Sequence, residues 1–283
     1  MGGAQLEMPG MPRRLFPATP SKLAAFSDCP RRYRHAYVDR PTPAKGPAWA
    51  HNSVGSAVHA ALRSWWELPL PKRTAVAARQ LLYGVWSTAG FRDAEQSERW
   101  RARAAGWLTD YVTGLDPADE PVGTERQVAA TTERLALSGR VDRIDQRDDE
   151  LVVVDYKTGR SVSTDDEARG SPALAAYVLG VRRTLRRPCS RVELHHLPSG
   201  TVAAFEHTDR SLANHVRRAE DVAADIAVAT AALDGGEDPD VAFPAVPGRQ
   251  CGWCDFRPSC AVGRAATPPR ETWSFLPEDT PAD

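Results

Sequence analysis

The feature that most constrains this chain is a pair of charges inside an apolar strand. The segment LVVVDYK (151–157) has the β-branched, apolar composition of a buried strand, yet it contains Asp155 and Lys157. Alternate residues of a strand point the same way, so these two side chains share one face. Lysine is rare here, since only four of the 36 basic residues are lysines. A lysine kept in such a strand indicates a specific role.

The preceding segment places a second carboxylate opposite the first. SGRVDRID (138–145) alternates as a strand and predicts the partner in a hairpin. A turn at Asp148-Asp149 places Asp142 opposite Asp155, with Cβ atoms roughly 4.5–5.5 Å apart, so that both carboxylates can bind one divalent cation. The alternative is an exposed hairpin whose Asp and Lys side chains are solvated or paired across the strands. The apolar residues around them count against that alternative.

The rest of the chain predicts an α/β fold, with a central mixed sheet flanked by helices. We expect a single domain over residues 21–266, with a helical part at 52–118, a sheet core at 119–208, and a C-terminal helix and cysteine cluster at 209–266. Within it, helices are expected over 52–67, 72–88, 94–113, 171–187 and 209–233. A flexible N-terminus over 1–20 and a disordered tail over 267–283 are also expected.

Five cysteines are distributed unevenly, and three of them form a tight cluster. Cys251, Cys254 and Cys260 occupy ten residues, and a four-thiolate centre needs one more ligand. Cys29 and Cys189 are the candidates. Cys29 is favoured because it follows a predicted helix and precedes Pro30, which suits a ligand loop. An iron–sulfur cluster and a zinc ion both remain possible centres, although a zinc ribbon normally supplies two C-x2-C pairs.

Composition narrows the class of protein without revealing its function. The 283 residues carry a net charge of −1, and the mean hydropathy is −0.44. No apolar run approaches the length of a membrane-spanning helix, and the first thirty residues lack the apolar stretch of a secretory signal. We therefore expect a cytoplasmic protein without a membrane partner, in which reduced cysteines are available for metal binding.

Three motifs occur in an order that resembles a known family. GSAVHAAL (55–62), SGRVDRID (138–145) and VVVDYKTGR (152–160) are similar to the successive motifs of RecB-family nucleases, which belong to the PD-(D/E)XK superfamily. The resemblance implies a restriction-endonuclease-like core and Mg²⁺- or Mn²⁺-dependent phosphodiester hydrolysis. It implies that His59, Asp142 and Asp155 bind the metal and that Lys157 is the catalytic lysine.

The resemblance also implies substrate contacts, with one departure. Tyr177 and Arg160 are the implied substrate-binding residues. The family usually has a Gln four residues before the Tyr, where this chain has Ala173. A core position in the helix is an equally good interpretation of Tyr177. Basic residues at 182–187 are a further candidate contact for phosphates, although a solvated helix face explains them as well.

A lone N-terminal Cys with a distant C-x2-C-x5-C resembles the iron–sulfur nucleases, which include the B subunit of AddAB enzymes and CRISPR-adaptation nucleases. This implies that Cys29, Cys251, Cys254 and Cys260 hold a [4Fe–4S] cluster as a clamp between the ends of the domain. We expect a DNA exonuclease acting on single-stranded or fraying ends in repair or recombination. The alternatives are a CRISPR-adaptation nuclease and a non-catalytic DNA-binding protein. A separate helicase would supply unwinding, because the sequence has no G-x-x-x-x-G-K-[ST] motif.

Overall fold

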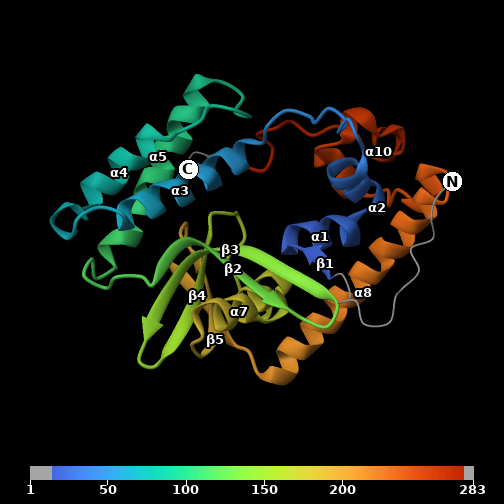
Figure 1. The fold of residues 1–283 in the computed structure, drawn as a ribbon. Coiled ribbons are helices and arrows are strands. Elements are labelled where there is room, and N and C mark those ends of the chain that lie inside the picture. Colours follow the sequence, from blue (N-terminus) through green and yellow to red (C-terminus); the bar gives the residue numbers. More distant parts are fainter. Residues whose placement is uncertain (1–14, 277–283) are drawn as a thin grey trace.

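Six strands form one mixed sheet in the computed structural model of the chain, which describes residues 15–276 (Figure 1). Strand order is β1-β3-β4-β5-β6, and β2 pairs with the remaining edge of β3. The strands span Phe16–Ala18 (β1), Gly123–Thr131 (β2), Leu135–Arg147 (β3), Glu150–Lys157 (β4), Cys189–His196 (β5) and Thr201–Glu206 (β6). β1 is parallel to β3 and β4 is parallel to β5, whereas the other pairs are antiparallel.

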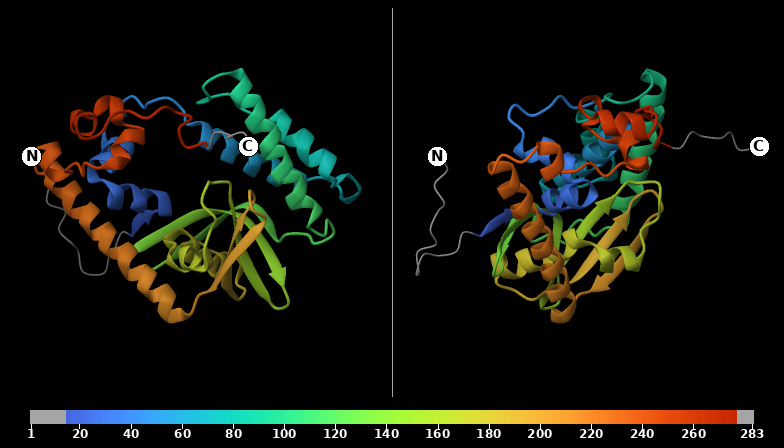
Figure 2. Two further views of the ribbon diagram at one scale, coloured as in Figure 1. Left: turned by 180° about the vertical axis from the view of Figure 1, so that it is seen from behind. Right: turned by 90° about the vertical axis from the view of Figure 1, so that its right-hand side faces the viewer.

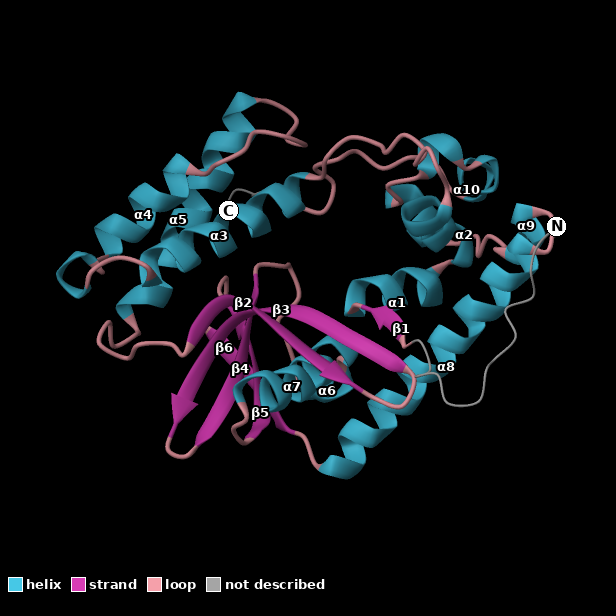
Figure 3. Ribbon diagram, in the orientation of Figure 1, coloured by secondary structure: helices cyan, strands magenta, loops and turns pink. Residues whose placement is uncertain are grey.

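Ten α-helices accompany the sheet in the described part of the chain (Figure 3). They span Pro20–Asp28 (α1), Pro30–Tyr33 (α2), Ala50–Trp66 (α3), Ala75–Gly84 (α4), Ala94–Thr113 (α5), Asp165–Gly170 (α6), Pro172–Leu185 (α7), Asp209–Asp234 (α8), Pro239–Ala242 (α9) and Ala261–Ala266 (α10). None of the described helices combines the length and apolar character needed to cross a membrane.

The register of the β3–β4 hairpin confirms the sequence prediction. Arg147 pairs with Glu150 across the turn, and the ladder continues to Arg143 opposite Val154. Asp142 and Asp155 are therefore the next positions, where β4 begins to leave β3. At this point the Asp142 side chain replaces the backbone contact between the strands: its Oδ2 accepts a hydrogen bond from the Tyr156 amide at 2.9 Å.

Helices cover both faces of the sheet (Figure 2). Val152, Val154 and Tyr156 of β4 pack with α3, α4 and α5 on one face, while Leu151 and Val153 pack with α7 on the other. α7 also makes the connection between the parallel strands β4 and β5. β4 is therefore apolar on both faces, which explains its continuous β-branched sequence.

Three segments differ from the expectations. The predicted flexible N-terminus includes Phe16–Ala18, which instead form β1 because they pair with Leu135–Leu137. The predicted disordered tail includes Leu276, which is buried in the core around α3 and α5. Residues 1–14 and 277–283 of these two predictions lie outside the described residues. The predicted helix over 72–88 is shorter, because Thr74 caps α4 by accepting from the Ala77 amide and the helix ends at Gly84.

Candidate metal centre and active site

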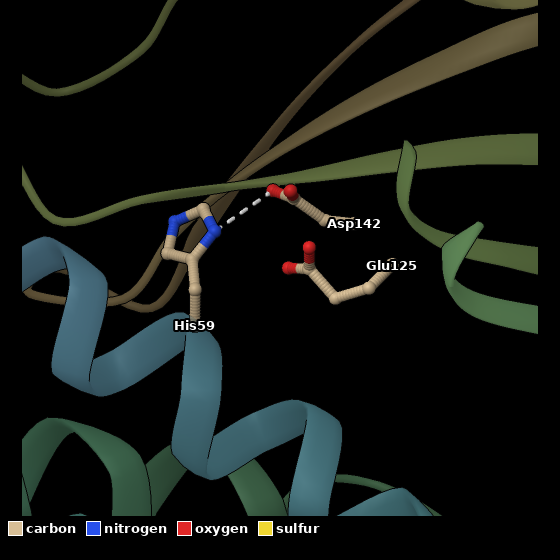
Figure 4. A group of neighbouring side chains, drawn as sticks. All are labelled: His59, Glu125 and Asp142. Atoms are coloured by element: carbon tan, nitrogen blue, oxygen red, sulfur yellow. Dashed lines mark ion pairs between the residues drawn. The ribbon is translucent and has the colours of Figure 1, made fainter. Parts of the chain in front are cut away.

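Three side chains from three elements converge where β4 leaves β3 (Figure 4). His59 comes from α3, Glu125 from β2 and Asp142 from β3, and one ligand atom of each lies within 4.8 Å of the other two. All three residues are partly buried. An imidazole nitrogen with two carboxylates is a donor set that suits a divalent cation such as Mg²⁺ or Mn²⁺.

His59 is oriented by contacts at both ring nitrogens. Its Nδ1 lies 3.3 Å from Asp142 Oδ2, and its Nε2 lies 3.2 Å from the Tyr156 carbonyl oxygen. Holding one nitrogen on a backbone carbonyl is how metal-binding histidines are commonly fixed, and it directs the other nitrogen at the carboxylates. Burial alone would lower the pKa of His59, but the hydrogen bond and charge of Asp142, with the charges of Asp155 and Glu125, raise it.

Glu125 is the residue that the sequence analysis missed. Its neighbours Thr124 and Arg126 pair with Arg143 and Val141, so Glu125 lies opposite Asp142. Its φ of 48° is in the left-handed region, which is costly for a residue other than glycine and is found often at functional sites. Burial and the charge of Asp142 raise the pKa of Glu125. The signal in the sequence that identifies Glu125 is strand pairing in the β2–β3 hairpin. The same argument linked Asp142 to Asp155 in the next hairpin.

Asp155 and Lys157 form an ion pair beside these residues. Lys157 Nζ lies 2.5 Å from Asp155 Oδ2, so Asp155 contacts the lysine and is not one of the three clustered ligands. The sequence predicted His59, Asp142 and Asp155 as the ligands, whereas the structure groups Glu125 with the first two. The ion pair does not exclude Asp155 as a ligand, because Glu125 Oε2 likewise lies 2.6 Å from Arg140 Nε, so Asp155 stays a predicted ligand. Burial raises the pKa of Asp155, Lys157 lowers it, and the charge of Asp142 raises it again.

Tyr177 of α7 lies next to the same carboxylates. Burial, with the charges of Asp155 and Asp142, raises its pKa to about 12, so its hydroxyl stays protonated and can donate a hydrogen bond. Its ring packs on Gly139 so closely that a Cβ there would lie 2.5 Å from Tyr177 Cε1. The glycine of the SGRVD motif therefore makes room for Tyr177. Tyr177 also packs against the core on this side of the sheet, as its alternative interpretation from sequence predicts. Its contact with substrate stays a prediction.

Arg160 and the basic run at 182–187 lie at different distances from the carboxylates. Arg160 is exposed in the loop after β4 and lines a cavity near the site. The basic run at 182–187 lies near Cys189, which is level with Leu151 at the far end of β4 from Lys157. Six strand residues separate those two ends, or about 20 Å. That run is therefore distant from the carboxylates.

Four cysteines line a single cavity of about 430 Å³ between α2 and α10: Cys29, Cys251, Cys254 and Cys260. Cys29 Sγ accepts a hydrogen bond from the Val246 amide at 3.4 Å, which links the N-terminal and C-terminal segments. Burial raises the pKa of Cys254. Cys189 is buried elsewhere, at the start of β5. His35 Nε2, a buried nitrogen with no hydrogen-bond partner among the described residues, belongs to a residue that also lines this cavity.

A model of the PD-(D/E)XK nuclease superfamily matches residues 17–261, which include every residue of the carboxylate site and all four clustered cysteines. The chain belongs to the PD-(D/E)XK nuclease superfamily. Membership makes it a metal-dependent nuclease, a hydrolase of phosphodiester bonds. No curated protein matches the sequence significantly.

Two crystal structures match most of the chain at low sequence identity. One is a "putative exonuclease" from Eubacterium rectale, with a TM-score of 0.48 and 11% identity, covering 78% of this chain and 82% of that one. The other is the protein SSO0001, with a TM-score of 0.37 and 16% identity, covering 89% of each chain.

Proposed function

We propose that this superfamily member is a RecB-type DNA exonuclease that acts, in the cytoplasm, on single-stranded or fraying ends during repair or recombination. The observation that carries the proposal is the convergence of His59, Glu125 and Asp142 beside the Asp155–Lys157 ion pair. This arrangement combines ligands for a divalent cation with Lys157, which lies on the same face of β4 as Asp155. Hydrolysis of a phosphodiester requires both a cation and a positive charge of this kind.

Each residue has a distinct task in this proposal. His59, Asp142 and Asp155 would hold Mg²⁺ or Mn²⁺, as the sequence predicts, and Glu125 would be a further ligand. When bound, the cation lowers the pKa of a coordinated water and neutralises charge on the scissile phosphate. Lys157 stabilises the charge that develops on the phosphate oxygens, and Asp155 orients it at 2.5 Å. Tyr177 donates a hydrogen bond to a neighbouring phosphate from its protonated hydroxyl, and Arg160 provides a cationic contact.

The cysteine cavity supports the proposal of a structural [4Fe–4S] cluster on Cys29, Cys251, Cys254 and Cys260. Cys29 comes from the N-terminal segment and the other three cysteines from the C-terminal one, and all four line the same cavity. Four thiolates are the usual ligands of such a cluster. A zinc ion is the alternative, although a zinc ribbon normally supplies two C-x2-C pairs and this chain has one.

Two alternative functions use the same architecture. A CRISPR-adaptation nuclease would have the same carboxylate site and cysteine centre, and the neighbouring genes of the source organism distinguish it. A non-catalytic DNA-binding protein is favoured only by Ala173, which replaces an amide that the family uses. The acidic cluster beside a lysine argues against it, because a scaffold has no need of converging carboxylates. Unwinding of duplex DNA is assigned to a separate helicase.

The direct test is incubation of purified, cluster-loaded protein with end-labelled single-stranded and blunt double-stranded DNA. We expect shortening of the single strand from an end with Mg²⁺ or Mn²⁺ and none in EDTA. Circular single-stranded DNA is the control for an exonuclease, because it has no ends. Cleavage of the circle would contradict the exonuclease assignment, and intact substrates under all metal conditions would contradict nuclease activity.

A further inference from the structure

A second cavity, of about 660 Å³, lies between the helical part and the C-terminal segment and has an unusual lining. Three arginines and a histidine line it together with four large aromatic residues: Arg103, Arg160, Arg270, His51, Trp100, Trp107, Trp253 and Phe275. No Asp or Glu is among the described residues that line it, although the chain has 37 acidic residues. Cationic groups interleaved with aromatic rings suit phosphates and bases together.

One wall is a packed stack from the C-terminal segment. The Arg270 guanidinium lies 5.0 Å from the Trp253 ring centroid and 5.4 Å from that of Phe275. The two rings meet edge to face at 5.3 Å, and the Arg270 amide donates to the Gly252 carbonyl at 3.1 Å. Trp253 lies between two of the clustered cysteines, so the cysteine loop positions this wall.

A second part of the lining comes from α5 and the loop after β4. Trp100 and Trp107 lie at 5.8 Å with their rings steeply inclined, and the Arg103 guanidinium is 5.1 Å from the Trp100 ring. Thr158, Gly159, Arg160 and Ser161 complete the lining. Arg160 is exposed and lines the same cavity as these aromatic residues.

Two elements that line the cavity also carry residues of the candidate active site. The loop that lines the cavity begins at Thr158, directly after Lys157. A contact of 2.8 Å between the Gly159 carbonyl oxygen and His196 Nε2 fixes this loop. On α3, His51 lines the cavity, and His59 follows eight residues later, about 12 Å along the helix. Between them, Gly55 allows close approach, since a Cβ there would lie 3.2 Å from Thr158 Oγ1.

We propose that this cavity binds the unpaired bases and adjacent phosphates of single-stranded DNA, a short distance along the strand from the scissile bond. The inference rests on the proposed nuclease function. It identifies the part of the substrate that the cavity binds, which is an unpaired strand. Bases of a duplex are stacked on one another, so only a single strand presents base faces to Trp107 and Trp253. The arginines neutralise the phosphates of the same strand. The cavity therefore selects single strands over duplexes.

The experiment measures binding separately from cleavage. Fluorescence anisotropy of a labelled oligothymidylate, in EDTA so that the strand stays intact, is recorded over a salt series for the full-length protein and its variants. Trp107→Ala is expected to weaken binding roughly 5- to 100-fold without changing the salt dependence, as loss of a stacked base should. Arg160→Ala is expected to reduce the slope of log K against log salt by about 0.7, as loss of one phosphate contact on a single strand should.

Matched variants control for folding and for general charge. Trp107→Phe keeps an aromatic ring and is expected to recover most of the affinity. Arg183→Ala removes an exposed arginine at the distant end of α7, and both its affinity and its salt slope should equal those of the wild type. Circular dichroism melting of each variant shows whether it is folded, and the exposed Arg160 keeps the test valid if Trp107→Ala does not fold.

The outcomes separate this inference from the proposed function. If Trp107→Ala and Arg160→Ala bind the strand as the wild type does, or if a blunt hairpin duplex binds as tightly as the single strand, the cavity assignment is wrong even when cleavage is normal. If the strand binds as expected but no metal supports its cleavage, the nuclease proposal is wrong and the binding assignment stands.

Discussion

At the scale of single residues, Asp142 connects the parts of the site. One of its oxygens accepts the Tyr156 amide at 2.9 Å and faces His59 Nδ1 at 3.3 Å. Its charge also raises the pKa of Glu125 and of Asp155. A single carboxylate thus fixes the end of the hairpin and the position of the imidazole, which makes the geometry of the site depend on the register of two strands.

Lys157 provides the sharpest test of the proposed chemistry. Lys157→Met keeps the length of the side chain and removes its charge, and we expect cleavage to fall about 10²- to 10³-fold while DNA binding is retained. Lys72→Met, at an exposed lysine outside the site, is the matched control and should cleave normally. Single-turnover cleavage rates measure both. A Lys157→Met protein with the wild-type rate would show that the lysine has no part in the reaction.

Glu125 can be tested through metal affinity. Glu125→Gln preserves the size of the side chain and removes one anionic ligand, so Mn²⁺ binding measured by calorimetry should weaken by about tenfold or more. Glu133→Gln, an exposed residue at the opposite end of the β2–β3 hairpin, should bind Mn²⁺ as the wild type does. Equal affinities in the two variants would remove Glu125 from the site.

At the scale of elements, the sequence predicted the hairpin better than its surroundings. The register of Asp142 and Asp155 followed from one turn and from alternation, because both are local properties. Glu125 was missed because the pairing of β2 with β3 was not considered and because its backbone leaves the extended region. β1 was missed because three residues beside prolines carry little periodic signal, and its stability comes from pairing with a distant strand.

β5 carries a buried charge network that gives a prediction of pH dependence. Glu193 is 2% exposed and accepts hydrogen bonds from Arg147, Arg191 and His195. Burial alone would raise the pKa of Glu193, but these partners lower it well below its usual range. A lowered native-state pKa contributes stability that is complete above the unfolded-state value near 4.5 and is lost as the pH falls toward the native-state value.

Glu193→Gln should therefore lower the free energy of unfolding by about 2–3 kcal/mol at pH 7, because Arg147 and Arg191 are partly exposed and keep some hydration. The deficit should shrink as the pH falls below 4.5. Urea unfolding between pH 3 and pH 7 measures it, with Glu133→Gln, at an exposed residue outside this network, as control. A deficit that is constant with pH would mean that the charge of Glu193 is not the source of its contribution.

At the scale of the whole molecule, the cysteine cavity joins segments that are more than two hundred residues apart. Replacing Cys29 by Ser should release iron and lower the free energy of unfolding by about 2–5 kcal/mol, because ligation closes the longest loop in the domain. Cys189→Ala is the control and should retain iron. Iron and zinc analysis of anaerobically purified protein, with thermal melting, measures the effect. Stoichiometric zinc without iron would overturn the cluster, and an unchanged melting curve would remove its structural role.

The fold and the separate sites give one account, in which the carboxylate cluster cleaves a strand that the neighbouring aromatic cavity holds. The most direct measurement is a cleavage time course of end-labelled single-stranded DNA with saturating Mn²⁺, comparing the wild type with Asp142→Asn. Asn keeps an oxygen to accept the Tyr156 amide but removes the charge, so the fold should persist. We predict that the wild type shortens the strand and that Asp142→Asn leaves it intact while still binding it. Cleavage by Asp142→Asn at the wild-type rate would contradict the account.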